Sequence, residues 1–202
     1  PAACLRPVAV PEARCAPCSE KIHDITILWT RFFPLRGGVV DAAALLQNGN
    51  QFLKTKKLVY AVKLYDENSI LIAIRENSTF VHPGEKFLIF EPNLEIQNRE
   101  PKSALVELRG VSWEPGEAAP LRIDVARKNI LLEDALSPRL EVNLKNQANQ
   151  TYKNIEAAAL ILGKDDTILG VSRTIVDVIG ISADKNIVFT WPEAIPGALK
   201  AE

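Results

Sequence analysis

The three cysteines are the residues whose type and spacing come closest to chemistry in this chain of 202 residues. Cys15 and Cys18 have the C-x-x-C spacing that can hold a metal ion or a redox-active disulfide. A tetrahedral metal site needs four ligands, and only Cys4 and His23 lie nearby to complete it. A haem attachment site needs a histidine directly after the second cysteine, where Ser19 stands. A local disulfide, with one cysteine left over for a bond to another molecule, is the chemistry that this spacing supports best.

A lipid anchor is a competing use of the first cysteine. Ala2-Ala3-Cys4 is similar to the end of a lipoprotein cleavage site, although Pro1 stands where such sites usually carry leucine. The chain begins with proline and contains no methionine, which indicates the mature or trimmed part of a longer precursor. A body without thiols behind a cysteine-bearing leader suits an exported protein. We therefore expect an extracellular or cell-surface address.

The composition removes two classes of partner. Lys and Arg total 24 against 25 Asp and Glu, and 47% of the residues are hydrophobic. A net charge of −1 gives no electrostatic drive toward nucleic acid or an anionic membrane surface. No apolar stretch approaches the roughly 20 residues that span a bilayer. We expect a well-packed soluble protein that meets a membrane only through an unseen N-terminal anchor or a lipid.

Side chains for catalysis or cofactor binding are scarce. The two histidines are His23, before the first expected strand, and His82, in a Pro-Gly turn, and no nucleophile stands beside either of them in a known motif. The acidic turns at residues 66–68 and 165–166 offer too few adjacent oxygen ligands for calcium. We therefore predict no catalytic residue, no cofactor and no metal site.

The sequence pattern changes from an extended arm to strands at about residue 24. The arm, residues 1–21, carries prolines at positions 1, 7, 11 and 17, which disfavour helix. After it, apolar and polar residues alternate with the period of a strand, as in Leu58, Tyr60, Val62 and Leu64. Turn-forming residues separate the runs. The alanine-rich segments 41–46 and 155–162 would tolerate helix, but we predict buried strands there because both are flanked like strands.

An internal repeat sets the domain organisation. Residues 61–75 match residues 159–173 without a gap at an offset of 98, and Asn48 meets Asn146 at the same offset. After a two-residue insertion, residues 87–92 meet residues 187–192. This period indicates two copies of one β-domain, each long enough to bury its own core. With a turn signal every 8 to 12 residues, each copy is expected to be an immunoglobulin-like or fibronectin-like β-sandwich.

The predicted boundaries follow from this repeat. They are an extended arm at 1–21, a first sandwich at 22–112, a short linker at 113–120, a second sandwich at 121–196 and a tail at 197–202. A linker of about eight residues keeps two domains close together. Trp29, Trp113 and Trp191 each lie near a strand end, so we expect them in the cores, at the seam between the domains or on a binding platform.

The segment Val62-Lys63-Leu64-Tyr65-Asp66 resembles the motif of the FxLYD domain, with valine in place of the leading phenylalanine. The order around it is similar too, with a Pro-Gly turn at Pro83-Gly84 and a strand that ends in Glu91-Pro92. The second copy departs from the motif and reads Leu160-Ile161-Leu162-Gly163-Lys164. The resemblance spans residues 24–192 as two tandem modules. It implies a small β-sandwich of bacterial exported or membrane-anchored proteins and brings no catalytic residues.

These observations predict a non-catalytic structural or adhesive protein of the cell surface, in which self-association or other surface proteins supply the partners. A subunit of a filament or surface array is one form of it. The sequence ends ten residues after Pro192, and one hypothesis is that the second sandwich lacks its last strand and that the arm or first domain of one subunit covers the exposed edge on the next. A second sandwich that is complete with fewer strands is the alternative for the edge. The alternative for the function is a binding module that recognises a polysaccharide or protein through its faces or loops.

Overall fold

The computed structural model of the chain describes residues 22–96, 99–118, 121–133 and 136–202. Its elements are β-strands apart from one turn of 3-10 helix, η1 (Lys164–Asp166), and all of its strand pairs are antiparallel. The predicted all-β class is therefore confirmed. The predictions for the arm and for Cys4, Cys15 and Cys18 lie outside the described residues.

The first half, residues 22–118, folds into two facing sheets. Its strands are β1 (Thr26–Leu35), β2 (Val39–Gln47), β3 (Leu53–Tyr65), β4 (Leu71–Val81), β5 (Lys86–Glu95), β6 (Ser103–Val111) and β7 (Glu114–Pro115). One sheet has the order β1-β2-β5, and the other has the order β4-β3-β6 with β7 also paired to β3. Gly37 and Gly38 have positive φ angles in the turn from β1 to β2, a conformation that glycine adopts without steric cost.

The second half, residues 121–202, repeats this order. Its strands are β8 (Ile123–Leu131), β9 (Arg139–Asn146), β10 (Tyr152–Leu162), β11 (Ile168–Ile179), β12 (Asp184–Thr190) and β13 (Lys200–Ala201). The sheets have the orders β12-β9-β8 and β11-β10-β13. Each strand except the short β13 therefore has a counterpart of similar length in the first half, taken in chain order.

A separate hydrophobic core lies between the sheets of each half. Leu58, Tyr60, Val62 and Leu64 of β3 point into the first core, which the alternation of side chains along a strand predicts. The second core includes Ile155, Ala159 and Ile161 of β10 together with side chains of β9, β11 and β12. Because each core is built from its own half, the chain encloses two sandwich-like pairs of sheets.

A buried asparagine stands at the same place in each half. Asn48 follows β2, and its amide donates to the carbonyls of Leu53 and His82 at 2.8 and 2.9 Å. Asn146 ends β9 and donates to the carbonyls of Gln150 and Gly180, both at 2.8 Å. Each side chain thus satisfies backbone carbonyls at strand ends and in the loops beside them.

The structure corrects the register of the repeat. Leu64 corresponds to Ile161, Ala73 to Gly170 and Ala104 to Ala201, because these residues face one another in the two sets of ladders, and the offset is 97 in each case. The gapless match at 98 therefore pairs core-facing residues of β3 with outward-facing residues of β10. The cause is a register shift between Thr55 and Leu58 in the β3–β4 ladder that the β10–β11 ladder lacks, since a slip of one residue exchanges the two faces of a strand.

Two predicted boundaries also differ from the structure. Part of the predicted linker forms β7, which pairs with residues 53–54 of β3, and Trp113 packs against the first core. Part of the predicted tail forms β13, which pairs with Ile161 and Leu162 of β10. Both short strands lie at sheet edges, where a few backbone hydrogen bonds to a neighbouring strand outweigh the weak strand signal of the local sequence.

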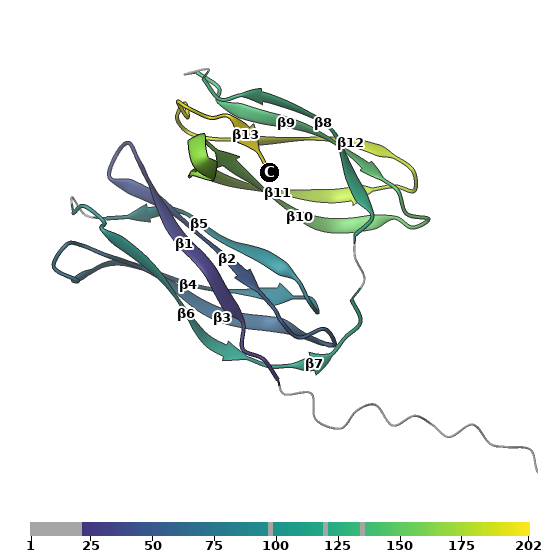
Figure 1. Cartoon of the computed structure of the whole chain (residues 1–202), viewed down its shortest axis with the longest axis horizontal. Coiled ribbons are helices and arrows are strands. Elements are labelled where there is room, and N and C mark those ends of the chain that lie inside the picture. Colours follow the sequence, from purple (N-terminus) through teal and green to yellow (C-terminus); the bar gives the residue numbers. More distant parts are fainter. Residues whose placement is uncertain (1–21, 97–98, 119–120, 134–135) are drawn as a thin grey trace, which may run out of the picture.

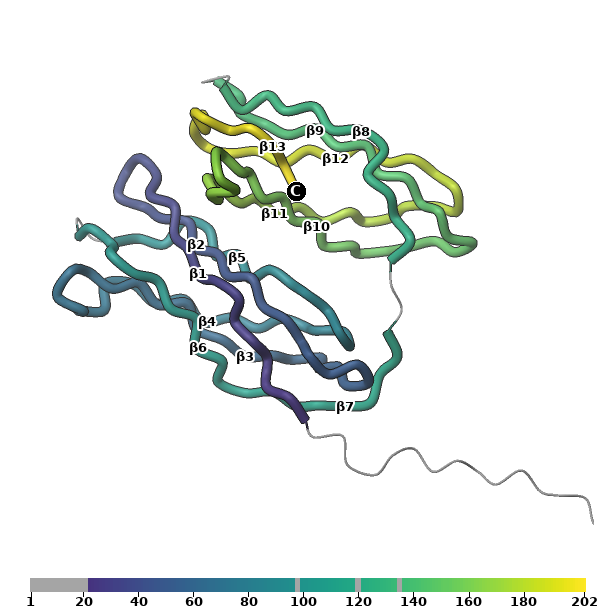
Figure 2. The backbone as a smooth tube through the Cα atoms, in the orientation of Figure 1, coloured from purple at the N-terminus to yellow at the C-terminus, as the bar shows by residue number. Residues whose placement is uncertain are grey.

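The two halves lie against each other. Figure 1 shows β2 and β5 of the first half facing β10 and β11 of the second, and β5 contacts β11. In Figure 2, the backbone can be traced from β7, at one end of the first half, to β8 of the second half. We call the contact between the two halves the seam.

Candidate functional site between the two halves

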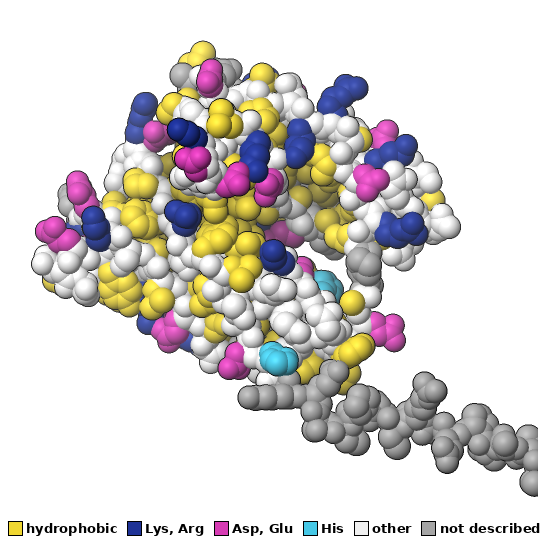
Figure 3. Space-filling model, viewed as in Figure 1, with side chains coloured by type: hydrophobic (Ala, Val, Ile, Leu, Met, Phe, Trp, Pro, Cys, Tyr) yellow, Lys and Arg dark blue, Asp and Glu magenta, His cyan; other side chains and the backbone are white. Residues whose placement is uncertain are grey.

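Two outward-facing residues show that the seam excludes water. Ala43 of β2 points away from the first core, between Ala42 and Ala44, yet only 1% of its surface is exposed. Val171 of β11 belongs to neither core and is 2% exposed. On the face shown in Figure 3, hydrophobic side chains gather along the seam. Burial of such apolar surface stabilises the contact by about 25 cal/mol for each Å² removed from water.

Polar groups also join the halves at the end of β1. The backbone amide of Arg36 donates to the carboxylate of Glu193, and the Nε atom of Arg36 lies 3.4 Å from Glu193 Oε2. The Arg36 side chain is 90% exposed, so the charge pair itself contributes little to stability. Its effect is to fix the β1–β2 turn against the loop that follows β12.

Asp41 is a buried carboxylate at the seam. It lines a cavity with Phe33 and Leu35 from the first half and with Trp191 from the second. Its Oδ1 accepts the backbone amide of Asn93 at 2.9 Å. Burial raises the pKa of Asp41, and the amide of Asn93 opposes that shift. The hydrogen bond holds the irregular β5 backbone at Asn93, whose φ of 54° is left-handed.

A second buried carboxylate lies within the first core. The hydroxyl of Tyr60 donates to Glu91 Oε1 at 2.7 Å, and the amide of Asn77 donates to the same oxygen at 3.1 Å. Burial raises the pKa of Tyr60, and the bond to Glu91 raises it further, whereas Arg173 of the second half lowers it. Charges of the second half therefore act on a side chain of the first core.

An apolar hollow at the seam lies beside the β4–β5 turn and forms a groove. This hairpin groove has a volume of about 610 Å³ and is lined by Gln51, Phe80, residues 82–85, Ala118, Leu121 and residues 152–156. The rings of Phe80 and His82 meet edge to face at 5.5 Å. This size and lining suit an extended apolar segment or a drug-sized molecule.

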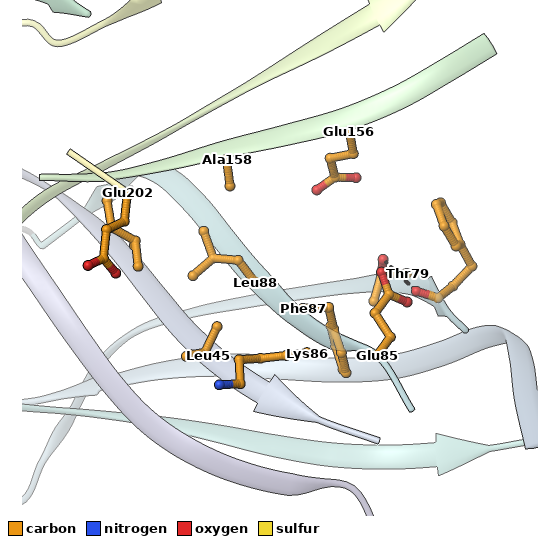
Figure 4. Close-up of a pocket in the computed structure, with 11 residues that line it drawn as sticks. Leu45, Thr79, Glu85, Lys86, Phe87, Leu88, Glu156, Ala158 and Glu202 are labelled. Carbon is orange, nitrogen blue, oxygen red and sulfur yellow. Dashed lines mark hydrogen bonds between the residues drawn. The ribbon is translucent and has the colours of Figure 1, made fainter. Parts of the chain in front are cut away.

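A neighbouring cavity shares Phe80, Glu85 and Glu156 with the hairpin groove and continues along β10. Its volume is about 310 Å³. Figure 4 shows Ala158 and Glu156 directed into it from β10, across from Leu45 and Leu88 of the first half. We call this second space the β10 cavity.

Several ionisable groups of the described residues are held in structural contacts. Asp66 of the first acidic turn accepts the amides of Asn68 and Ile70 at 3.0 and 2.9 Å, and Asp166 of the second pairs with Lys200 at 2.8 Å. Within the described ranges, His, Cys, Asp and Glu side chains form no group of three or more that could hold a metal ion. His82 is exposed in its turn, as the sequence predicted. The geometry of the seam suits binding of apolar chain segments.

The tryptophans predicted as interface residues take three different positions. Trp191 is buried in the second core, donates to the carbonyl of Val171 at 3.1 Å and lines a cavity at the seam. Trp113 packs on the first core, and Trp29 is half-buried on β1. The structure therefore brings only Trp191 to the seam. The cysteines predicted for a disulfide or tether lie outside the described residues.

Sequence reasoning missed the residues that form the two hollows, among them Phe80, Leu88 and Glu156. The sequence contained one indication that β2 has a second contact surface. The segment 39–46 is apolar at almost every position, and a strand without a polar face indicates that both of its faces are covered. That pattern indicated a second contact surface on β2, although it could not name the strand that covers it.

Neither a scan against protein-family models nor a search of curated proteins found a match to this chain. Among the residues that the structure describes, none of the helical segments has the length and apolar character needed to cross a bilayer.

Proposed function

We propose that the protein is a non-catalytic structural or adhesive element of a cell surface, built from two tandem immunoglobulin-like β-sandwich domains behind the N-terminal arm. The observation that carries this proposal is the seam. It joins the two halves through buried apolar side chains such as Ala43 and Val171 rather than leaving them to move on a linker. A pair of sandwiches fixed in this way is a stiff spacer, which is what a surface element requires.

The local structure around the FxLYD-like segment is consistent with the family resemblance. Val62 and Leu64 point into the first core, and Asp66 accepts two backbone amides of the turn that follows. The motif thus combines alternate core residues with a turn-capping carboxylate. Membership of that family, and the bacterial surface address that it implies, belong to this proposal.

A binding module is the second candidate, and the hairpin groove favours it. Phe80 and Leu121 are about half exposed in this groove, where they give a partner apolar surface to cover. In this alternative, the stiff seam serves to hold the groove open in one shape.

One pair of measurements separates the two functions. Sedimentation velocity and negative-stain microscopy of the full chain are expected to show ordered assemblies that grow with concentration. A chain that stays monomeric at every concentration would overturn the structural proposal.

A peptide array tests the binding module. If the monomeric chain binds apolar synthetic decapeptides on the array, and Phe80→Ala abolishes this binding, the binding module is supported instead. Ile74→Ala, which removes an exposed apolar side chain from the same strand but outside the groove, is the matched control.

A further inference from the structure

Asp41 is a charged residue on the face of β2 that the second half covers. It lies two positions before Ala43, so the two side chains point to the same face of the strand, and 7% of the surface of Asp41 is exposed. An ionised carboxylate is costly away from water unless hydrogen-bond donors or an opposite charge compensate it. The contacts of Asp41 therefore show what this position lacks.

The compensation of Asp41 is incomplete. Its Oδ1 atom accepts the backbone amide of Asn93 at 2.9 Å. Its Oδ2 atom accepts no hydrogen bond from a residue that the structure describes, and no described Lys, Arg or His nitrogen forms an ion pair with either oxygen. The amide of Asn93 is neutral, so the negative charge of the carboxylate has no positive charge beside it.

A cavity opens beside this carboxylate. Residues 33–35 and Asp41 of the first half form one wall, and residues 169–171 and 191–196 of the second half form the other. We call this space the Asp41 cavity. Its volume of about 220 Å³ is that of roughly seven water molecules at about 30 Å³ each, which is room for a molecule with about that many non-hydrogen atoms. An adjoining cavity of about 340 Å³ also borders Asp41 and Trp191.

The walls of the Asp41 cavity are mainly apolar, and they include the rings of Phe33 and Trp191. The Nε1–H group of Trp191 donates to the carbonyl of Val171 at 3.1 Å, so the indole is held in place and its donor is already used. Aromatic rings attract a nearby ammonium group through the negative charge on their faces. The cavity therefore offers a ligand apolar contact, aromatic contact and a buried carboxylate.

Glu193 also borders the cavity, but its charge is already compensated. Its side chain is 29% exposed, accepts the backbone amide of Arg36 and lies 3.4 Å from the Nε atom of the same residue. Arg36 is not among the residues that line the cavity, and its side chain is 90% exposed. The charge that the cavity leaves without a counter-ion is therefore that of Asp41.

We propose that the Asp41 cavity binds a small primary ammonium compound with an apolar body. The ammonium group donates to Oδ2 of Asp41, and the apolar body lies against Phe33 and Trp191. Because the carboxylate is kept from water, a bond between it and a charged donor is stronger than the same bond at the surface. The ligand touches both halves and thereby holds the seam closed.

An NMR titration of the full chain at pH 7 tests this site, with benzylamine, which is protonated at that pH, as the probe. The indole N–H signal of Trp191 is expected to shift and to saturate with a dissociation constant of about 1 mM, within the usual range of binding energy for so small a ligand. The indole signals of Trp29 and Trp113 should stay in place, because neither residue lines the cavity. Benzyl alcohol has nearly the same shape without the charge, and it should bind about tenfold more weakly or worse.

Two variants identify the carboxylate that binds the ammonium group. Asp41→Asn keeps the size of the side chain and an oxygen for the amide of Asn93, but it removes the charge, so binding of benzylamine should weaken about tenfold or more. Glu193→Gln is the matched control on the same cavity. It should change the affinity less than about threefold, because Arg36 already neutralises Glu193. The indole spectra without ligand report whether each variant is folded.

Three results would overturn the proposal. The first is the absence of a saturable shift of Trp191 at benzylamine concentrations about tenfold above the expected constant. The second is equal binding of benzylamine and benzyl alcohol, because Asp41 would then be protonated or hydrated in the cavity. The third is unchanged binding in Asp41→Asn. If that variant does not fold, the comparison of the two probes on the unaltered chain decides alone.

This inference is independent of the proposed function. A chain that assembles and binds no amine would keep the structural role and lose the ligand site. A chain that binds benzylamine as a monomer would do the reverse.

Discussion

The two halves share one order of strands but close their sheets differently. In the first half, β6 pairs with β3 over eight residues of β3, and in the second, β13 covers only two residues of β10. The cores themselves are comparable, since each has side chains from both of its sheets. The comparison teaches that one order of strands can enclose two cores that differ in detail, since among the described residues the Tyr60–Glu91 contact belongs to the first core.

The buried asparagines are the most stringent test of how far the halves are equivalent. Asn48→Ala and Asn146→Ala each remove an amide that satisfies two or more buried carbonyls. Each is expected to cost about 3 kcal/mol of unfolding free energy, since several buried groups lose their partners. Urea denaturation followed by fluorescence measures both. A loss below about 1 kcal/mol in either variant would show that the two positions are not equivalent. Asn143→Ala, which removes a half-buried asparagine on β9 whose amide donates to the Asn186 side chain, is the control.

The second test concerns the seam and asks whether it holds the two halves together. Val171→Asp places a charge where 2% of the side chain is exposed, and it is expected to cost about 2 kcal/mol and to separate the halves while each core stays folded. Ile175→Asp is the control, because Ile175 lies on the same face of β11 and is 62% exposed. Small-angle scattering should show a larger radius of gyration only for the first variant. An unchanged radius with both would mean that the linker, and not the seam, sets the geometry.

Much of the fold was predictable because it depends on local pattern. Alternating residues in β3 and the turn at Gly37-Gly38 each follow from backbone geometry that neighbouring residues determine. The register of the repeat was not predictable, because one extra residue between Thr55 and Leu58 exchanges the faces of β3 relative to β10 without changing the appearance of the sequence match.

The candidate site depended on packing between distant segments. Phe80 and Glu156 are 76 positions apart in the sequence, and nothing in either neighbourhood indicates that they line one cavity. The tryptophans were singled out for their type, but two of the three lie away from the seam. The short strands β7 and β13 were missed for the same reason, since each exists only because a longer strand presents an edge to it.

The smallest expected effect concerns a contact that only the first half has. Tyr60 bonds to Glu91 inside the first core, and the ladders place Ala157 at the corresponding position in the second. Tyr60→Phe keeps the ring and removes the hydroxyl, so it is expected to cost about 1 kcal/mol at pH 7, with Asn77 still bonded to the carboxylate. Tyr152→Phe is the matched control in the second half. Its half-buried hydroxyl accepts the amide of Arg122 at 3.2 Å, so a smaller loss is expected.

The pH dependence of that loss provides an independent check. Because burial raises the pKa of Tyr60, the phenol ionises at a lower pH in the unfolded chain than in the folded one. The stability that this difference provides is complete below the ordinary tyrosine pKa of about 10 and is lost as the pH rises above it. Urea denaturation between pH 8 and pH 11 should therefore show a steeper decline for the unaltered chain than for Tyr60→Phe. Parallel declines would mean that Tyr60 is open to water in solution, and hence that it is not held against Glu91 inside the first core.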